Sequence, residues 1–92
     1  MNKQELISQY HKLMMKYDRV LVYRIDPIYP IDEQIVDCKE LLQILDSLSS
    51  NNQHELIGLR LDIERFKTEK HYMYSFIKGC SDYYKKIMPL GS

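Results

Sequence analysis

The chain has 92 residues, 45% apolar and 28% charged, which is the composition of one small globular domain and not of a disordered segment. Thirteen Lys and Arg residues balance thirteen Asp and Glu residues, which argues against the basic excess of most nucleic-acid binders and the acidic excess of DNA mimics. The longest apolar run, Val20–Tyr23, is too short to span a membrane, and no secretory leader opens the chain. We therefore expect a cytoplasmic protein without membrane contact.

The first predicted element is a helix over residues 2–25. Its apolar residues recur at spacings of three and four, which is the helical period: Leu6, Tyr10, Leu13, Tyr17 and Val20. The helix should end at Asp26, because the residue before a proline disfavours the α conformation. The β-branched and aromatic residues 20–25 leave a short strand open as an alternative, but the unbroken stripe favours a helix.

The second predicted element is a helix over residues 31–48, for which Asp32 is the expected N-cap. Its stripe consists of Ile31, Ile35, Cys38, Leu42 and Leu45. Further apolar residues widen this face: Val36, Leu41, Ile44 and Leu48. We expect this helix to be buried on more than one side.

The third predicted element is a long helix over residues 52–88, with Asn52 and Glu55 as its capping pair. A heptad stripe runs along it, interrupted only by Lys70. As one helix it would be about 54 Å long, whereas a break near Thr68 would give four helices in all. The predicted fold is therefore all-α: a single domain, residues 1–92, forming a three-helix antiparallel bundle or coiled coil with a long C-terminal helix.

The acidic side chains concentrate in residues 25–56, while residues 1–24 and 57–92 carry a basic excess. This distribution favours antiparallel packing of the middle of the chain against both ends.

Apolar residues beyond the stripes indicate a surface for a protein partner. The second helix is too short to cover the rear of the third, where the apolar face is widest. We expect partner contacts, in a homodimer or with a target, from Tyr72, Tyr74, Phe76, Tyr83 and Met88. Packing inside the bundle is the alternative. Ile57 and Leu61, one turn apart on the opposite side, form a second candidate contact.

Residues for catalysis, cofactor binding or metal binding are not apparent, and we do not expect an enzyme. His54-Glu55 could begin an HExxH zinc motif, but Gly58 occupies the position of the second histidine. Cys38 and Cys80 fall on apolar stripes, as expected for buried, inert thiols.

These features predict a non-catalytic protein that binds another protein stoichiometrically, as an inhibitor, adaptor or regulator. The abundance of Lys, Ile, Asn and Tyr suits an AT-rich genome and favours a phage or other mobile element as the source. A nucleic-acid-binding regulator is one alternative, through four bases of the last helix: Arg60, Lys67, Lys78 and Lys85. The other alternative is a helical bundle of the bacteriocin-immunity type. In size and helical content the chain is similar to small bacteriocin immunity proteins, a resemblance that identifies no site residue.

Overall fold

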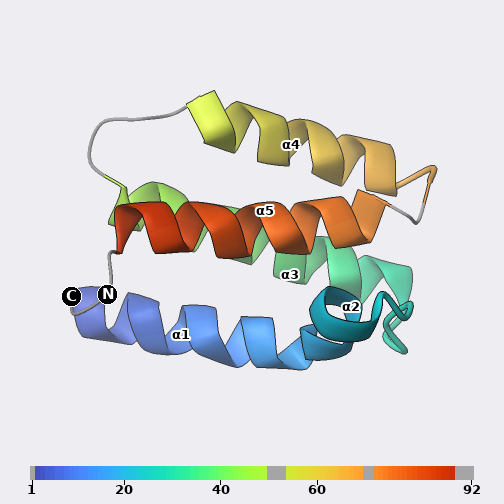
Figure 1. Cartoon of the computed structure of the whole chain (residues 1–92), viewed down its shortest axis with the longest axis horizontal. Coiled ribbons are helices and arrows are strands. Elements are labelled where there is room, and N and C mark those ends of the chain that lie inside the picture. The colour runs from blue at the N-terminus through green and yellow to red at the C-terminus, as the bar shows by residue number, and fades with distance from the viewer. Residues whose placement is uncertain (1, 50–53, 70–71, 89–92) are drawn as a thin grey trace.

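The computed structural model describes residues 2–49, 54–69 and 72–88, which form helices and connecting segments without a strand. The helices are α1 (Lys3–Lys16), α2 (Asp18–Tyr23), α3 (Ile31–Leu48), α4 (His54–Phe66) and α5 (Tyr72–Ile87). Figure 1 shows α1, α3, α4 and α5 side by side in alternating directions, as an antiparallel bundle. The short α2 and residues 24–30 lie at one end of this bundle. The all-helical prediction is confirmed.

The predicted long helix over residues 52–88 is wrong, because the chain folds back after Phe66. The carbonyl of Arg65 accepts hydrogen bonds from the backbone N–H groups of Thr68, at 3.1 Å, and Glu69, at 2.8 Å, which close the last turn of α4. The Thr68 hydroxyl donates to the same carbonyl at 3.1 Å. The break thus occurs near Thr68. Lys70 lies outside the described residues, as does the expected capping residue Asn52.

Folding back lets the two halves of the heptad stripe bury each other. Leu59 and Ile63 of α4 and Met73 and Ile77 of α5 are each at most 4% exposed. A single long helix would have left the rear half of this stripe in water, so burial of apolar surface outweighs continuation of the helix.

The first predicted helix also divides in two. Tyr17 leaves the α conformation, at φ −111° and ψ 20°, and its side chain is fully buried. Helix α2 ends at Tyr23, and its C-cap is Arg24, whose φ of 54° is left-handed. Residues 18–23 are therefore helical, and Ile25 lies beyond the helix. Four residues of the predicted stripe are buried, Tyr10, Leu13, Tyr17 and Val20, whereas its first member, Leu6, is partly buried against the core.

Helix α3 matches its predicted range, but its N-cap is Pro30 and not Asp32. Asp32 instead lies in the first turn, where a carboxylate favours the helix dipole. Ile31 and Val36, expected on the apolar face, are 40% and 63% exposed. The stripe rotates away from them because Asp37 is buried and accepts a hydrogen bond from the Tyr17 hydroxyl.

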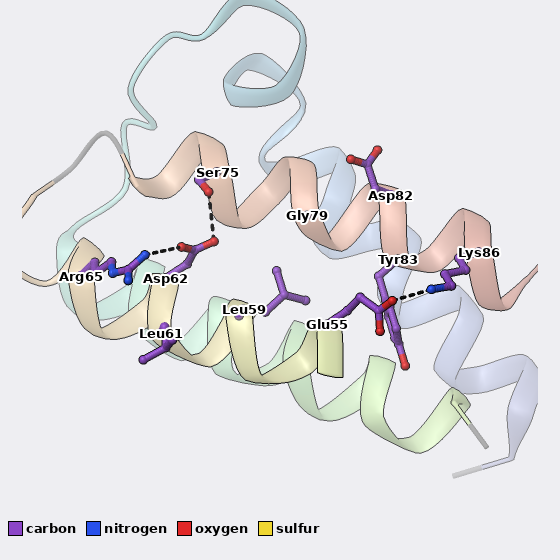
Figure 2. A pocket seen from close by; sticks show the side chains of 11 residues that line it. Glu55, Leu59, Leu61, Asp62, Arg65, Ser75, Gly79, Asp82, Tyr83 and Lys86 are labelled. Carbon is purple, nitrogen blue, oxygen red and sulfur yellow. Dashed lines mark hydrogen bonds and ion pairs between the residues drawn. The ribbon is translucent and has the colours of Figure 1, made fainter. Parts of the chain in front are cut away.

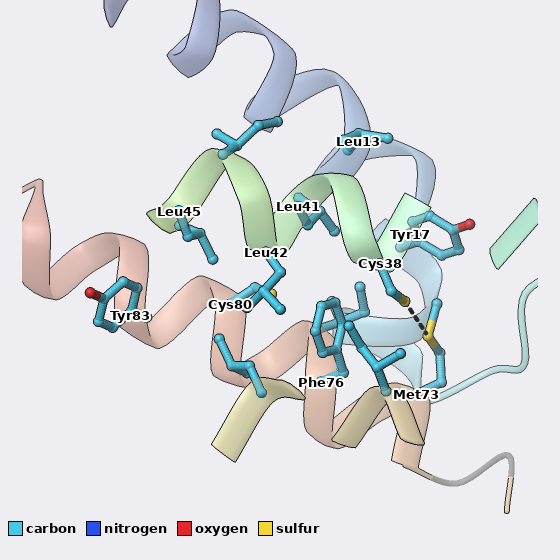
Figure 3. Packing of buried hydrophobic residues seen from close by; sticks show 14 of the residues in the cluster. Leu13, Tyr17, Cys38, Leu41, Leu42, Leu45, Met73, Phe76, Cys80 and Tyr83 are labelled. Atoms are coloured by element: carbon cyan, nitrogen blue, oxygen red, sulfur yellow. Dashed lines mark hydrogen bonds between the residues drawn. The ribbon is translucent and has the colours of Figure 1, made fainter. Parts of the chain in front are cut away.

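Phe76 and Tyr83 lie in the core and not on a surface, being 0% and 3% exposed. Figure 3 shows both among side chains of the core cluster. For Phe76 and Tyr83 the alternative of packing inside the bundle is correct, and their expected exposure is wrong, because α5 is covered on several sides. It packs on α2, α3 and α4, while Tyr10 of α1 stacks on its Tyr84 with ring centroids 4.0 Å apart.

Ion pairs join the acidic middle of the chain to its basic ends, as the charge distribution predicts. Lys16 pairs with Asp37 at 2.8 Å and also with Glu33. Lys86 of α5 pairs with Glu55 of α4. These contacts fix α1 against α3 and α4 against α5.

Candidate protein-binding surfaces

The aromatic residues expected to bind a partner do not form a surface together. Phe76 and Tyr83 are core residues, whereas Tyr72, Tyr74 and Met88 are half-buried. The Tyr72 ring lies beneath the guanidinium of Arg65, 5.4 Å from the ring centroid. Ile57 and Leu61, the second predicted contact, are 53% and 48% exposed.

A surface with more exposed apolar residues than the Ile57–Leu61 pair lies at the end of the bundle, over residues 15–28. We call it the end surface, and its five members are each at least half exposed: Met15, Val22, Tyr23, Ile25 and Ile28. Sequence reasoning assigned none of them to a site. A signal was present, since four consecutive apolar residues, 20–23, cannot all face inward from one helix.

Three members of the end surface are neighbours in space. Met15, Ile25 and Ile28 line one hollow, whose lining also includes four charged residues: Lys16, Asp18, Arg19 and Asp26. Val22 and Tyr23, the last two residues of α2, follow Arg19 by about one helical turn and do not line the hollow. In Figure 1 this part of the chain lies at the end of the bundle opposite the start of α1.

One anchor of the end surface is Arg24, directly before Ile25. The guanidinium of Arg24 lies 4.3 Å from the centroid of the Tyr74 ring and donates a hydrogen bond to the Tyr74 hydroxyl at 3.2 Å. These contacts with α5 offset the cost of a left-handed backbone at a residue other than glycine. Arg24 therefore fixes where the chain leaves α2.

The other anchor is Tyr29, directly after Ile28. Its carbonyl accepts a hydrogen bond from the Gln34 side chain at 2.6 Å, and its ring packs edge-on against Tyr17 at 5.7 Å. Prolines at positions 27 and 30 restrict the backbone on either side. The segment is thus held at both ends, while Ile28 between the anchors is 86% exposed.

A separate groove of about 420 Å³ lies between α4 and α5, and Figure 2 shows its lining. Its carboxylates take part in ion pairs and hydrogen bonds. Glu55 binds Lys86 through Oε1, and that hydrogen bond lowers the pKa of Glu55, while Glu55 Oε2 is buried and has no hydrogen-bond partner among the described residues. Asp62 accepts a hydrogen bond from the Ser75 hydroxyl at 3.0 Å and lies 3.9 Å from Arg65 of its own helix. The Glu55–Lys86 and Asp62–Ser75 contacts join α4 and α5, so we assign the groove a structural role.

Two of the bases considered for nucleic-acid binding are neutralised by acidic residues three or four positions away in the chain. Lys67 pairs with Glu64 at 3.1 Å, and Lys78 pairs with Asp82 at 2.9 Å. This pairing weakens the positive field that a nucleic-acid surface needs.

Within residues 2–49, 54–69 and 72–88, no group of three or more His, Cys, Asp or Glu side chains is arranged to hold a metal ion. Among the described helices, none is long and apolar enough to cross a membrane. Comparisons with protein-family models, with curated proteins and with solved structures found no match.

Proposed function

We propose that the chain is a non-catalytic protein that acts by stoichiometric binding of a partner protein, as an inhibitor, adaptor or regulator. The end surface is the contact, and the observation that carries this proposal is its five apolar side chains, each at least half exposed, of which Met15, Ile25 and Ile28 line one hollow. Single exposed apolar residues are ordinary, whereas a cluster of them marks an interaction site.

The way the end surface is held supports this function. Arg24 and Tyr29 fix the segment that carries Ile25 and Ile28, so little conformational freedom remains to be lost when a partner binds. A flexible loop with the same residues would bind more weakly, because ordering it opposes binding.

Photo-cross-linking in the cells that make the protein tests the proposal. A benzoylphenylalanine at position 28 should cross-link to one defined partner. The control is the same residue at Ser8, an exposed position in the first half of α1. A missing product at position 28, or equal products at both positions, would contradict the proposal.

Two variants then separate contact from preorganisation. Ile28→Asp should weaken binding of the captured partner at least tenfold, because it places a charge in an apolar contact. Arg24→Gly keeps every apolar side chain of the end surface and permits the left-handed backbone, but it removes the anchor on Tyr74. We expect a smaller loss of affinity from Arg24→Gly. Sedimentation of the free protein will show whether the bound partner is a second copy of the chain.

A further inference from the structure

The outer face of α4 carries a second apolar surface, separate from the end surface. Ile57 and Leu61 stand one helical turn apart on this face. They line a groove of about 360 Å³ between α3 and α4, together with Leu42 and Ile63. Leu42 and Ile63 are buried, at 9% and 4% exposure, so the groove has an apolar floor.

Gly58 lies beside these two exposed side chains, on the side of α4 that lines the groove with α5, and has no role in packing that would explain it. A Cβ atom built at Gly58 would meet nothing within 4 Å, whereas one built at Gly79 would lie 2.6 Å from Leu59 Cδ2. Packing therefore explains Gly79 but not Gly58. Glycine inside a helix is destabilising relative to alanine, and a local cost without a structural gain is typical of a functional position.

The missing side chain at Gly58 leaves a gap beside Ile57 and Leu61, on the side of α4 that faces the groove with α5. Without a Cβ atom at this position, the backbone of another helix can approach α4 closely. Figure 2 shows Leu61 directed away from α5, so it is available on the outer side of α4. Ile57, Leu61 and the gap at Gly58 together form a surface on which the apolar side of another helix can pack.

The charges along the groove favour an acidic partner. Lys39 and Arg60 line it, and neither forms an ion pair with a described carboxylate. Glu64, the acidic residue of the same lining, is neutralised by Lys67 at 3.1 Å. The charge left without a counterion beside the apolar floor is therefore positive.

We propose that the α3–α4 groove and the outer face of α4 bind an amphipathic helix of a partner protein, which crosses α4 over Ile57 and Leu61, passes beside Gly58 and carries carboxylates along its flanks. Its apolar ridge would lie against Leu42, Ile63 and the exposed pair, in the helix-in-groove manner. Its acidic flanks would face Lys39 and Arg60. This surface does not depend on the end surface, so either proposal can fail alone.

A library of displayed helical peptides, randomised at its apolar and flanking positions and sorted for binding to the purified protein, tests this inference. We expect the enriched peptides to carry Asp or Glu on the flanks of an apolar ridge. They should bind the Gly58→Leu and Leu61→Asp variants at least tenfold more weakly than the unmodified protein. The matched control Ile28→Asp should bind them with unchanged affinity.

The melting temperature of Gly58→Leu distinguishes a loss of peptide binding from a loss of folding. Because nothing lies within 4 Å of the added Cβ, its melting temperature should equal or exceed that of the unmodified protein. The proposal is overturned if no peptide is enriched, if the enriched peptides lack acidic flanks, or if they bind Gly58→Leu normally. It is also overturned if sedimentation shows a dimer of the free protein that Gly58→Leu dissociates, since the occupant would then be a second copy.

Discussion

The two glycines of the α4–α5 hairpin should respond in opposite ways to the same substitution. Gly58→Ala adds a methyl group in open space, whereas Gly79→Ala places one 2.6 Å from Leu59 Cδ2. Leu59 and Gly79 face each other in Figure 2 only because the chain folds back. Along one continuous helix they would be about 30 Å apart. The comparison therefore tests the fold as well as the local packing.

The magnitude follows from two opposing contributions. Each substitution should gain about 1 kcal/mol from the higher helix propensity of alanine. Gly79→Ala must also displace Leu59, which is 4% exposed and packed in the core, and overpacking of this kind costs about 1–3 kcal/mol. We expect Gly58→Ala to stabilise the protein by about 1 kcal/mol and Gly79→Ala to be less stable than Gly58→Ala by about 1–3 kcal/mol.

Urea unfolding of the two variants measures this difference, and a double-mutant cycle assigns its cause. In a Leu59→Ala background the obstructing methyl group is absent, so Gly79→Ala should become stabilising by about 1 kcal/mol. If Gly79→Ala stabilises the unmodified protein as much as Gly58→Ala does, the close approach of α4 and α5 is refuted. An unchanged effect of Gly79→Ala in the Leu59→Ala background would refute the role of Leu59.

Three further predictions concern the core. Phe76→Ala should lower the free energy of unfolding by about 3–5 kcal/mol in urea titrations, and a loss below 1 kcal/mol would restore the surface role first expected of this residue. Cys38 and Cys80, both fully buried, should react with a thiol reagent at pH 8 only as fast as the protein unfolds, so rapid labelling of the native protein would contradict their burial. Burial raises the pKa of Cys38 to about 12, so between pH 8 and pH 10 the unfolded thiol ionises and the folded one does not. The free energy of unfolding should therefore fall with rising pH, by about 1 kcal/mol from Cys38 alone, and Cys38→Ala should remove that part of the slope.

The sequence predicts the buried stripe of the last third of the chain but not its change of direction. Leu59, Ile63, Met73 and Ile77 are buried as the heptad pattern indicates. A heptad pattern identifies the apolar side of a helix and does not specify whether the chain continues or reverses. One indication of the break is present in the sequence: Lys70 interrupts the apolar stripe inside a run of polar residues. That run contains no glycine or proline to mark the end of a helix. Tertiary burial, which no local pattern shows, decides the break.

The partner surfaces were harder to predict, for a related reason. Whether an apolar residue such as Phe76 is exposed depends on how many helices pack around it, which the sequence does not show. The chain folds back after Phe66, so α4 becomes an additional helix that covers Phe76. Ile28 reads as an ordinary loop residue until the anchors at Arg24 and Tyr29 show that it is held outward. Arg24 contacts Tyr74 of α5, and the Tyr29 ring packs on Tyr17 of the preceding helical segment, so local sequence could not reveal these two contacts. The hydrogen bond from Gln34 to Tyr29 is local.

Titration calorimetry with the partner captured at position 28 tests the central claim, that the end surface is a binding site. We predict one partner molecule per chain, and an affinity for Ile28→Asp at least tenfold below that of the unmodified protein at an equal melting temperature. Equal affinities for Ile28→Asp and the unmodified protein would contradict the account.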